Sequence, residues 1–199
     1  MKRKIHLSIC CGLICAVLLS MSSFSAACDD LRQNVLRLHI IANSDSDADQ
    51  QLKLKIRDQI LAKTDGLFLN SENLEDAKTT IINNLPYFEE IANDVIKENG
   101  FDYTATVTFG TSEFDTRYYE DFTLPAGEYE SLIITLGNGD GQNWWCVVYP
   151  TVCVPAASKG DLSDTAKDKS TQIAKGGKRY VMRFKTVEIY EKIKKLINR

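Results

Sequence analysis

The chain has 199 residues, of which 26% are charged, and a formal net charge of −3 at pH 7, which suits a single globular domain of ordinary size. The charge is uneven, because residues 28–158 carry 9 Lys and Arg against 22 Asp and Glu, whereas residues 159–199 carry 12 against 5. The acidic body excludes nucleic-acid binding, which needs a positively charged surface to displace counterions.

The first 27 residues have the pattern of a secretory signal peptide. A basic start (1–4) is followed by an apolar run (5–19) and then by small residues that end at Ala27, and this order is typical of exported proteins. We expect cleavage after Ala27, because the apolar run is shorter than the ~20 residues that span a bilayer. An uncleaved membrane anchor is the alternative.

Hydrophobic periodicity predicts a strand and then a helix at the start of the mature chain. Residues 35–41 alternate, with apolar side chains on one face and Arg37 and His39 on the other, as in a strand. Ser46, followed three residues later by Asp49, marks the start of a helix. Its buried face is predicted to consist of Leu52, Ile56 and Ile60.

A second helical region runs from Glu72 to Glu98, with apolar residues at intervals of three and four. Pro86 lies in its middle, where it either kinks one helix or occupies the first turn of a second. We expect two helices, or one that is sharply bent. Asn99-Gly100 is a suitable C-terminal end for this helical region.

Strand patterns dominate the next fifty residues. Residues 103–109 alternate most clearly, and shorter strand-like runs follow at 117–123, 131–136 and 144–149. The glycines of 137–141 can supply the positive φ angles of a hairpin turn between the last two runs. The pattern therefore predicts a meander of about four antiparallel strands.

The C-terminal part begins with a polar stretch and ends in an amphipathic helix. Residues 180–184 are compatible with a short strand, and a helix with an apolar face of Ile189, Ile193, Leu196 and Ile197 follows. We expect an α+β fold, with an antiparallel sheet of about four to six strands and three or four helices. The expected organisation is a signal peptide (1–27), a main α+β body (28–154), a polar flexible loop (155–178), and a closing strand and helix of the same domain (179–199).

The acidic motif Asp45-x-Asp47-x-Asp49 resembles the start of a calcium-binding loop, but it lacks the rest of that pattern. Gln50 stands where the loop needs glycine and Ile56 where it needs glutamate. Aspartates at a helix N-terminus are favoured by the helix dipole, which explains them without a metal. No metal site and no cofactor are predicted.

His39 and Cys146 are the candidate pair for a thiol hydrolase. A reactive cysteine normally lies near a turn or helix start that lowers its pKa, whereas Cys146 lies within an apolar, strand-like run. We therefore expect no enzyme activity. A secreted or lipid-anchored hydrolase that uses these two residues remains the alternative.

The cysteines of an exported chain are expected to be oxidised. Cys146 and Cys153 lie close together in sequence, so a disulfide between them is the simplest prediction. Cys28 is the remaining thiol of the mature chain. It would be the N-terminal residue after cleavage, but Ser25 stands where a lipidation signal usually has leucine.

Trp144 and Trp145 are adjacent, so on a strand their side chains point to opposite faces. One ring can fill the core, whereas the other is covered by a loop, lies exposed or contacts a partner. Tryptophan is enriched among the residues that dominate binding interfaces. Burial of both rings within the monomer is the competing interpretation.

Three segments make the chain resemble the stage II sporulation protein R family. The first is RLHIIANSDSDADQQLKLKIRD, from Arg37 to Asp58; the second is PAGEYESLIITLGNGDGQNWWCVVYP, from Pro125 to Pro150; the third and weaker one is the C-terminal segment from Arg179. The first two segments are long and unusual in composition. The resemblance thus covers most of the mature chain.

The resemblance implies a secreted signal without catalytic activity. Proteins similar to this one are exported from the forespore into the space between forespore and mother cell. There they activate a membrane-embedded aspartic protease of the mother cell, which processes a pro-sigma factor. As a hypothesis, the contact with this protease is formed by Arg37, His39, Asn43, Asp45, Trp144 and Trp145.

The basic C-terminal segment is compatible with peripheral contact to anionic lipid or an acidic partner, although a solvated basic helix is the simpler explanation. The sequence leaves the oligomeric state open. A structural envelope protein is a weaker alternative.

Overall fold

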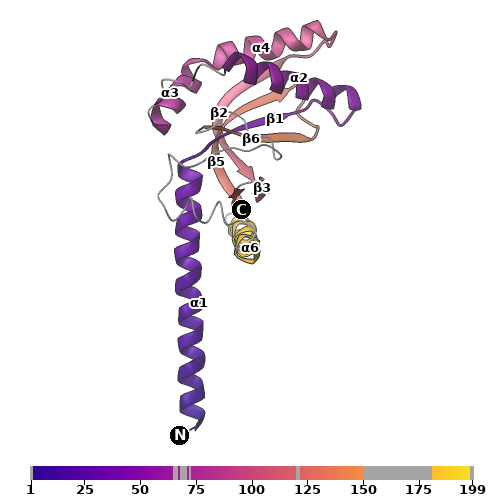
Figure 1. Cartoon of the computed structure of the whole chain (residues 1–199). Helices are drawn as coiled ribbons and strands as arrows, with labels where there is room; N and C mark the ends of the chain where they lie inside the picture. The colour runs from indigo at the N-terminus through magenta and orange to yellow at the C-terminus, as the bar shows by residue number, and fades with distance from the viewer. Residues whose placement is uncertain are drawn as a thin grey trace.

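The computed structural model describes residues 2–64, 67, 71, 73–119, 122–149 and 181–197. It consists of helices on one side of a four-stranded sheet, with a long N-terminal helix and a C-terminal helix on the other side (Figure 1). The described elements are α1 (Lys2–Gln33), β1 (Leu36–Ile41), α2 (Asp47–Thr64), α3 (Leu74–Asn83), α4 (Leu85–Glu98), β2 (Ala105–Phe114), β3 (Arg117–Tyr118), β4 (Thr123–Leu124), β5 (Gly127–Leu136), β6 (Asn143–Tyr149) and α6 (Val181–Ile197).

The predicted α+β class is confirmed, and the sheet has the order β2-β5-β1-β6. β1 pairs parallel with β5 and antiparallel with β6, and β2 pairs antiparallel with β5. The sheet is therefore mixed. The predicted meander is wrong, because β5 and β6 are separated by β1.

β1 occupies the centre because its side chains are buried on both faces, and a strand of that kind needs neighbours on both edges. Leu36, Leu38, Ile40 and Arg37 are all fully buried. The glycines of 137–141 serve a crossing connection instead of a hairpin. Gly137 and Gly139 do adopt positive φ angles, of 53° and 69°.

The main hydrophobic core lies between the sheet and α2, α3 and α4 (Figure 1). The predicted buried face of α2 is confirmed, since Leu52, Ile56 and Ile60 are at most 2% exposed. The predicted helix start is also confirmed: the backbone N–H of Asp49 donates to Ser46 Oγ at 3.2 Å, which satisfies one of the free donors of the first turn.

The predicted break at Pro86 is confirmed, because two helices, α3 and α4, meet at Asn84 and Pro86 lies in the first turn of α4. A proline there removes an N–H that has no helical partner in any case. α4 ends as predicted, since Gly100 has a φ angle of 78°, a conformation that glycine adopts without strain.

A second, smaller core covers one end of the opposite sheet face. It joins the last turns of α1 to the β3–β4 ribbon. The predicted strand at 117–123 is thus two strands of two residues each, which pair with each other and lie outside the main sheet. The buried residues are Leu31, Val35, Phe114, Tyr119, Phe122, Leu124, Tyr129 and Val147.

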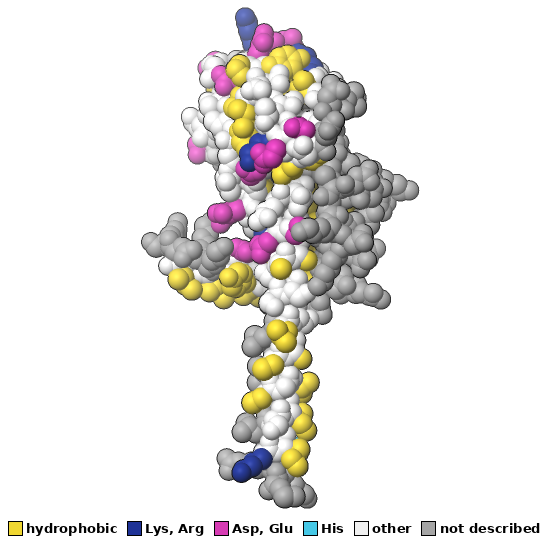
Figure 2. All heavy atoms as spheres, turned by 90° about the vertical axis from the view of Figure 1, so that its left-hand side faces the viewer, with side chains coloured by type: hydrophobic (Ala, Val, Ile, Leu, Met, Phe, Trp, Pro, Cys, Tyr) yellow, Lys and Arg dark blue, Asp and Glu magenta, His cyan; other side chains and the backbone are white. Residues whose placement is uncertain are grey.

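α1 is one continuous helix whose C-terminal turns pack against α6. The rings of Phe24 and Phe184 lie 5.2 Å apart, edge to face, and Cys28 and Val187 are buried beside them. Hydrophobic side chains lie exposed along the rest of α1 (Figure 2). Among the described residues, no helix is both long and apolar enough to span a membrane; the signal peptide and its cleavage stay predictions.

α6 differs from its prediction in two respects. The segment 181–184 is helical, so the predicted strand is wrong there; as part of a helix, Phe184 and Val187 point to the same side and both contact α1. The predicted apolar face is also not buried, because its four residues are 49–76% exposed. The predicted polar loop 155–178 lies outside the described residues.

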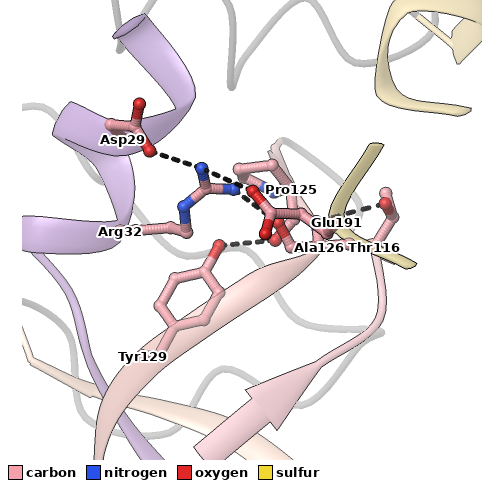
Figure 3. A network of polar contacts seen from close by, with 7 residues as sticks. All are labelled: Asp29, Arg32, Thr116, Pro125, Ala126, Tyr129 and Glu191. Carbon is pink, nitrogen blue, oxygen red and sulfur yellow. Dashed lines mark hydrogen bonds and ion pairs between the residues drawn. The ribbon is translucent and has the colours of Figure 1, made fainter. Parts of the chain in front are cut away.

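Arg32 links α1 to the sheet and to α6 (Figure 3). Its Nη1 donates to the carbonyl oxygen of Ala126 at 2.5 Å, and its Nη2 pairs with Asp29 and, at 3.4 Å, with Glu191 of α6. Burial opposes the charge, but the hydrogen bond with Asp29 and the nearby acidic groups raise the pKa of Arg32. The guanidinium thus holds the C-terminal turns of α1 against the start of β5 and against α6.

Candidate functional site

Half of the sheet face opposite α2 and α4 is not covered by the second core. Side chains of all four strands meet there, because β1, β2, β5 and β6 alternate in register. We call this region the open sheet face. It consists of the exposed Thr106, Thr108 and Asn143 and the half-buried His39, Ile41, Ile133, Thr135 and Trp145.

His39 lies at the centre of the open sheet face, with both ring nitrogens in hydrogen-bond contact. Nε2 is 3.0 Å from Asn143 Oδ1, an acceptor, so this nitrogen carries the proton and Nδ1 accepts from Ser112 Oγ at 3.3 Å. Burial lowers the pKa of His39, and Arg37 adds to this effect, while Asn143 opposes it. The ring is therefore neutral at pH 7 and held in one orientation.

The alternative prediction of a thiol-hydrolase dyad is wrong, because the side chains of Cys146 and His39 lie on opposite faces of the sheet. Cys146 pairs with Leu38 in the register of β6 on β1 and is fully buried in the main core. His39 contacts Trp145 and Phe114 on the other face, at ring distances of 6.0 and 5.9 Å. The sheet backbone separates the two side chains.

The predicted disulfide stays a prediction. Cys146 is not among the free cysteines of the described residues, which are Cys10, Cys11, Cys15 and Cys28. Cys153 lies outside the described residues. Burial raises the pKa of the Cys28 thiol to about 12, so this cysteine is a protonated, unreactive core residue at pH 7.

The two tryptophans point to opposite faces, as the alternation predicts. Trp144 packs against the main core with the Arg57 guanidinium 4.3 Å from its ring centre. Trp145 lies on the open sheet face with the Arg117 guanidinium 3.9 Å from its ring centre. Both rings are half-buried, so neither is an ordinary core residue.

Arg37, one of the six residues predicted to contact the protease, lies inside the protein. Its side chain is fully buried, with the guanidinium carbon 3.7 Å from the ring centre of Phe114 and 4.9 Å from that of Tyr129. Nη2 donates to the hydroxyl of Tyr119 at 3.1 Å. Aromatic rings thus enclose the charge in the covered half of the sheet face that also carries His39.

Asn43 and Asp45 hold the crossing connection 137–142 against the end of β1. Asn43 Oδ1 accepts from the N–H of Asn138 at 3.0 Å, and Asp45 Oδ1 accepts from the N–H of Gln142 at 2.7 Å. Asn43 Nδ2 also donates to Asp49 at 3.1 Å. The six predicted contact residues therefore do not form one surface, and only His39 and Trp145 belong to the open sheet face.

Asp49 joins this network, and its ionised form should stabilise the fold. Burial alone would raise its pKa, but hydrogen bonds from Ser44, Tyr103, Asn43 and Ser46 outweigh burial and lower the pKa below its usual value. A depressed pKa contributes stability above the unfolded-state value of about 3.9, and this stability is lost as the pH falls through the folded-state pKa.

We expect Asp49→Asn to lower the free energy of unfolding by about 1–3 kcal/mol at pH 7. The difference from the wild type should shrink as the pH falls below about 4. Urea unfolding at several pH values measures both quantities. Asp94→Asn, an exposed position on α4, is the control. A difference that does not change with pH would contradict a role for the ionised carboxylate.

Several residues of the site could not be identified from the sequence. Asn143 meets His39 because β1 pairs with β6, and Ser112 reaches it across β5, which pairs with both β1 and β2. Arg117 contacts Trp145 from the separate β3–β4 ribbon. The only available signal was the row of threonines in 104–108, which correctly indicated a solvent-facing side of that strand.

The fold and the site define an α+β domain that presents an open, mixed polar and aromatic sheet face beside a buried arginine. Residues 32–159 match the family model of stage II sporulation protein R. The chain belongs to this family, whose members are sporulation proteins.

The chain is similar to the stage II sporulation protein R of Bacillus subtilis (strain 168). The two are 41% identical over 134 residues, a region that covers 67% of this chain and 60% of the relative. The chain thus matches less than two thirds of that protein. No solved structure matches it.

Proposed function

We propose that the chain is a secreted sporulation signal. In this proposal it is exported across the forespore membrane into the intermembrane space and activates a membrane-embedded aspartic protease of the mother cell, which then processes a pro-sigma factor. Family membership carries the proposal. The matched region, 32–159, contains the whole sheet with its open face but excludes almost all of α1 and all of α6.

A ligand activates a protease only if it binds the active state better than the inactive one. A rigid surface suits this task, because little of its binding free energy is spent on ordering the ligand. The open sheet face is rigid in this sense: its residues belong to four paired strands, and His39 is held by Ser112 and Asn143.

We place the receptor contact on the open sheet face, with His39 and Trp145 at its centre. Trp145 is half-buried, aromatic and next to a cationic side chain, which are common features of residues that dominate an interface. The exposed Asp45 lies in the connection between β1 and α2 and can contribute at the rim. Arg37, Asn43 and Trp144 would affect receptor binding only indirectly, through the fold that presents this face.

The export step and the disulfide between Cys146 and Cys153 belong to the same proposal. The N-terminal charge and hydropathy pattern supports export, and an oxidising compartment would favour the disulfide. The protein needs no catalytic residue or cofactor of its own in this role. Peripheral lipid contact through the basic α6 is compatible with it.

The test mixes the purified chain with membranes that contain the sporulation protease and its sigma-factor precursor. Precursor cleavage that requires the chain supports the proposal; absence of cleavage with both proteins folded contradicts it. The surface is tested with Thr108→Arg, which places a large charge on the open sheet face. We expect activation to fall at least tenfold, a cost of about 1.4 kcal/mol, because the side chain would block close contact.

Thr79→Arg is the matched control. Thr79 is likewise exposed, but it lies on α3, on the other side of the molecule. The same substitution there should leave activation unchanged. Equal loss in both variants, or in neither, would remove the open sheet face as the contact surface while leaving the signalling role itself standing.

A further inference from the structure

Five buried side-chain N–H groups of the described residues lack an acceptor. One, Nε1 of Trp144, lies on the face of the main core, and the other four lie near the open sheet face. These four are Nε and Nη1 of Arg37, Nε of Arg117 and Nε1 of Trp145. Buried polar atoms without partners are rare in folded proteins, so each such atom calls for an explanation. Here these four occur together, on side chains that touch through shared rings.

The rings connect the two arginines. The Arg37 guanidinium lies 3.7 Å from the ring centre of Phe114, the Phe114 and Trp145 rings are 6.2 Å apart, and the Arg117 guanidinium lies 3.9 Å from the Trp145 ring centre. Arg37 is at the deep end and fully buried, whereas Arg117 and Trp145 are half-buried. The cluster therefore reaches from the interior to the open sheet face.

Within the described residues, no carboxylate forms an ion pair with the two arginines of this cluster. Burial lowers the pKa of Arg37; the groups that act on it besides are Tyr119, Tyr129 and the second cation, Arg117. Buried arginines normally pair with a carboxylate. The hydrogen-bond partner of the Arg37 guanidinium among the residues that the structure describes is the Tyr119 hydroxyl.

All four N–H groups that lack a partner are hydrogen-bond donors, and three of them belong to guanidinium groups. A carboxylate is the complementary ligand, since it offers only acceptors, carries the opposite charge and fits the planar guanidinium. A single carboxylate suits the site better than a polyanion, because the surrounding body of the chain, residues 28–158, is strongly acidic and repels large negative charges.

We propose that Arg117 and Trp145 bind an acidic side chain of a protein partner, with Arg37 as the buried charge behind them. The Arg117 Nε–H and the Trp145 Nε1–H each have less than 1 Å² of accessible surface, so these two half-buried side chains turn outward when they donate to the carboxylate oxygens. The site adjoins the open sheet face through His39 and Trp145. The identity of the partner as the receptor protease rests on the proposed function; the carboxylate site does not.

Tryptophan fluorescence of the full chain tests the site directly. The chain has two tryptophans, so Trp144→Phe leaves Trp145 as the reporter. The probe is the peptide acetyl-Gly-Asp-Gly-amide, whose only charge is the aspartate carboxylate. We expect a saturable change of Trp145 fluorescence with this peptide and none with acetyl-Gly-Asn-Gly-amide. Arg117→Gln should weaken the binding at least tenfold, and Arg117→Lys should restore only part of it.

The matched control is Arg57→Gln. Arg57 also lies over a tryptophan, Trp144, but on the opposite sheet face, so its loss should leave peptide binding unchanged. Equal responses to the aspartate and asparagine peptides would overturn the proposal. Tighter binding of inorganic phosphate than of the aspartate peptide would overturn it as well, in favour of a general anion site.

The cleavage assay separates this proposal from the signalling role. If the wild type activates the protease and Arg117→Gln does so equally well, the carboxylate site has no part in receptor binding, and that part of the proposal fails. If the wild type does not activate the protease, the signalling proposal fails, while the peptide titration still decides whether the carboxylate site exists.

Discussion

Arg37→Met should raise the stability of the protein, although it replaces the largest fully buried side chain. Methionine has a similar volume, makes favourable contacts with the neighbouring rings and removes a buried cation that no carboxylate of the described residues neutralises. Replacing buried ions with apolar groups of similar shape is often stabilising by about 1–4 kcal/mol. The lost contacts with Phe114, Tyr129 and Tyr119 offset part of this gain.

We expect a net gain of about 1–2 kcal/mol, seen as a rise of about 2–8 °C in the midpoint of thermal unfolding. Arg37→Lys is the control. Lysine keeps the charge but loses the planar contact with the rings, so the midpoint should fall. A lower midpoint for Arg37→Met would show that the ring contacts outweigh the cost of burying the charge.

A gain in stability would also bear on function. A protein that keeps a destabilising group usually needs it, because stabilising changes at functional sites often reduce activity. Arg37→Met should therefore bind the aspartate peptide more weakly than the wild type, even though it unfolds at a higher temperature. Peptide affinity and unfolding midpoint, measured on the same sample, would show whether the two quantities change in opposite directions.

Gly141→Ala should be among the most destabilising single-methyl changes in the chain. The N–H of Gly141 donates to the carbonyl oxygen of Ala42 at 2.9 Å, so the connection lies directly against the end of β1. A Cβ at this position would collide with the backbone carbonyl of Ser44 and lie 2.9 Å from the Cβ of Ala42. Backbone atoms cannot rotate away as a flexible side chain can.

The crossing connection would have to shift, and its bonds to Ala42, Asn43 and Asp45 would be weakened. We expect a loss of about 2–4 kcal/mol in the free energy of unfolding, or a decrease of about 5–15 °C in the unfolding midpoint. Gly110→Ala is the matched control. Gly110 lies in β2 with its nearest neighbour 3.9 Å from the added methyl group, and alanine there should be neutral or slightly stabilising. Similar losses in both variants would refute the steric argument.

Local patterns predicted the elements well, because each depends on residues that are close in sequence. The cap at Ser46, the break at Pro86 and the alternation of β1 and β2 all follow from propensity and periodicity within one segment. The order of the strands depends on which apolar faces meet in space. The glycines of 137–141 are equally compatible with a hairpin and with a crossing connection, and only the central place of β1 decides between them.

The candidate site was predictable only in part, for the same reason. The opposite orientation of Trp144 and Trp145 follows from the geometry of a strand, and it placed one ring on each face. Arg37 shares the face of His39 as predicted, yet its burial depends on Phe114, Tyr129 and the β3–β4 ribbon. Alternation gives the direction of a side chain and does not reveal what covers it.

The position of β1 has a kinetic consequence. Among the described strands, β1 is made first but pairs with the last two, β5 and β6, since Arg37 lies opposite Ser131 and Val147. The sheet cannot close until the chain has been synthesised as far as β6, and such long-range pairing makes folding slow. A newly made chain therefore remains without its core for most of its synthesis, and under the proposed export this keeps it in the unfolded form that a translocation channel accepts.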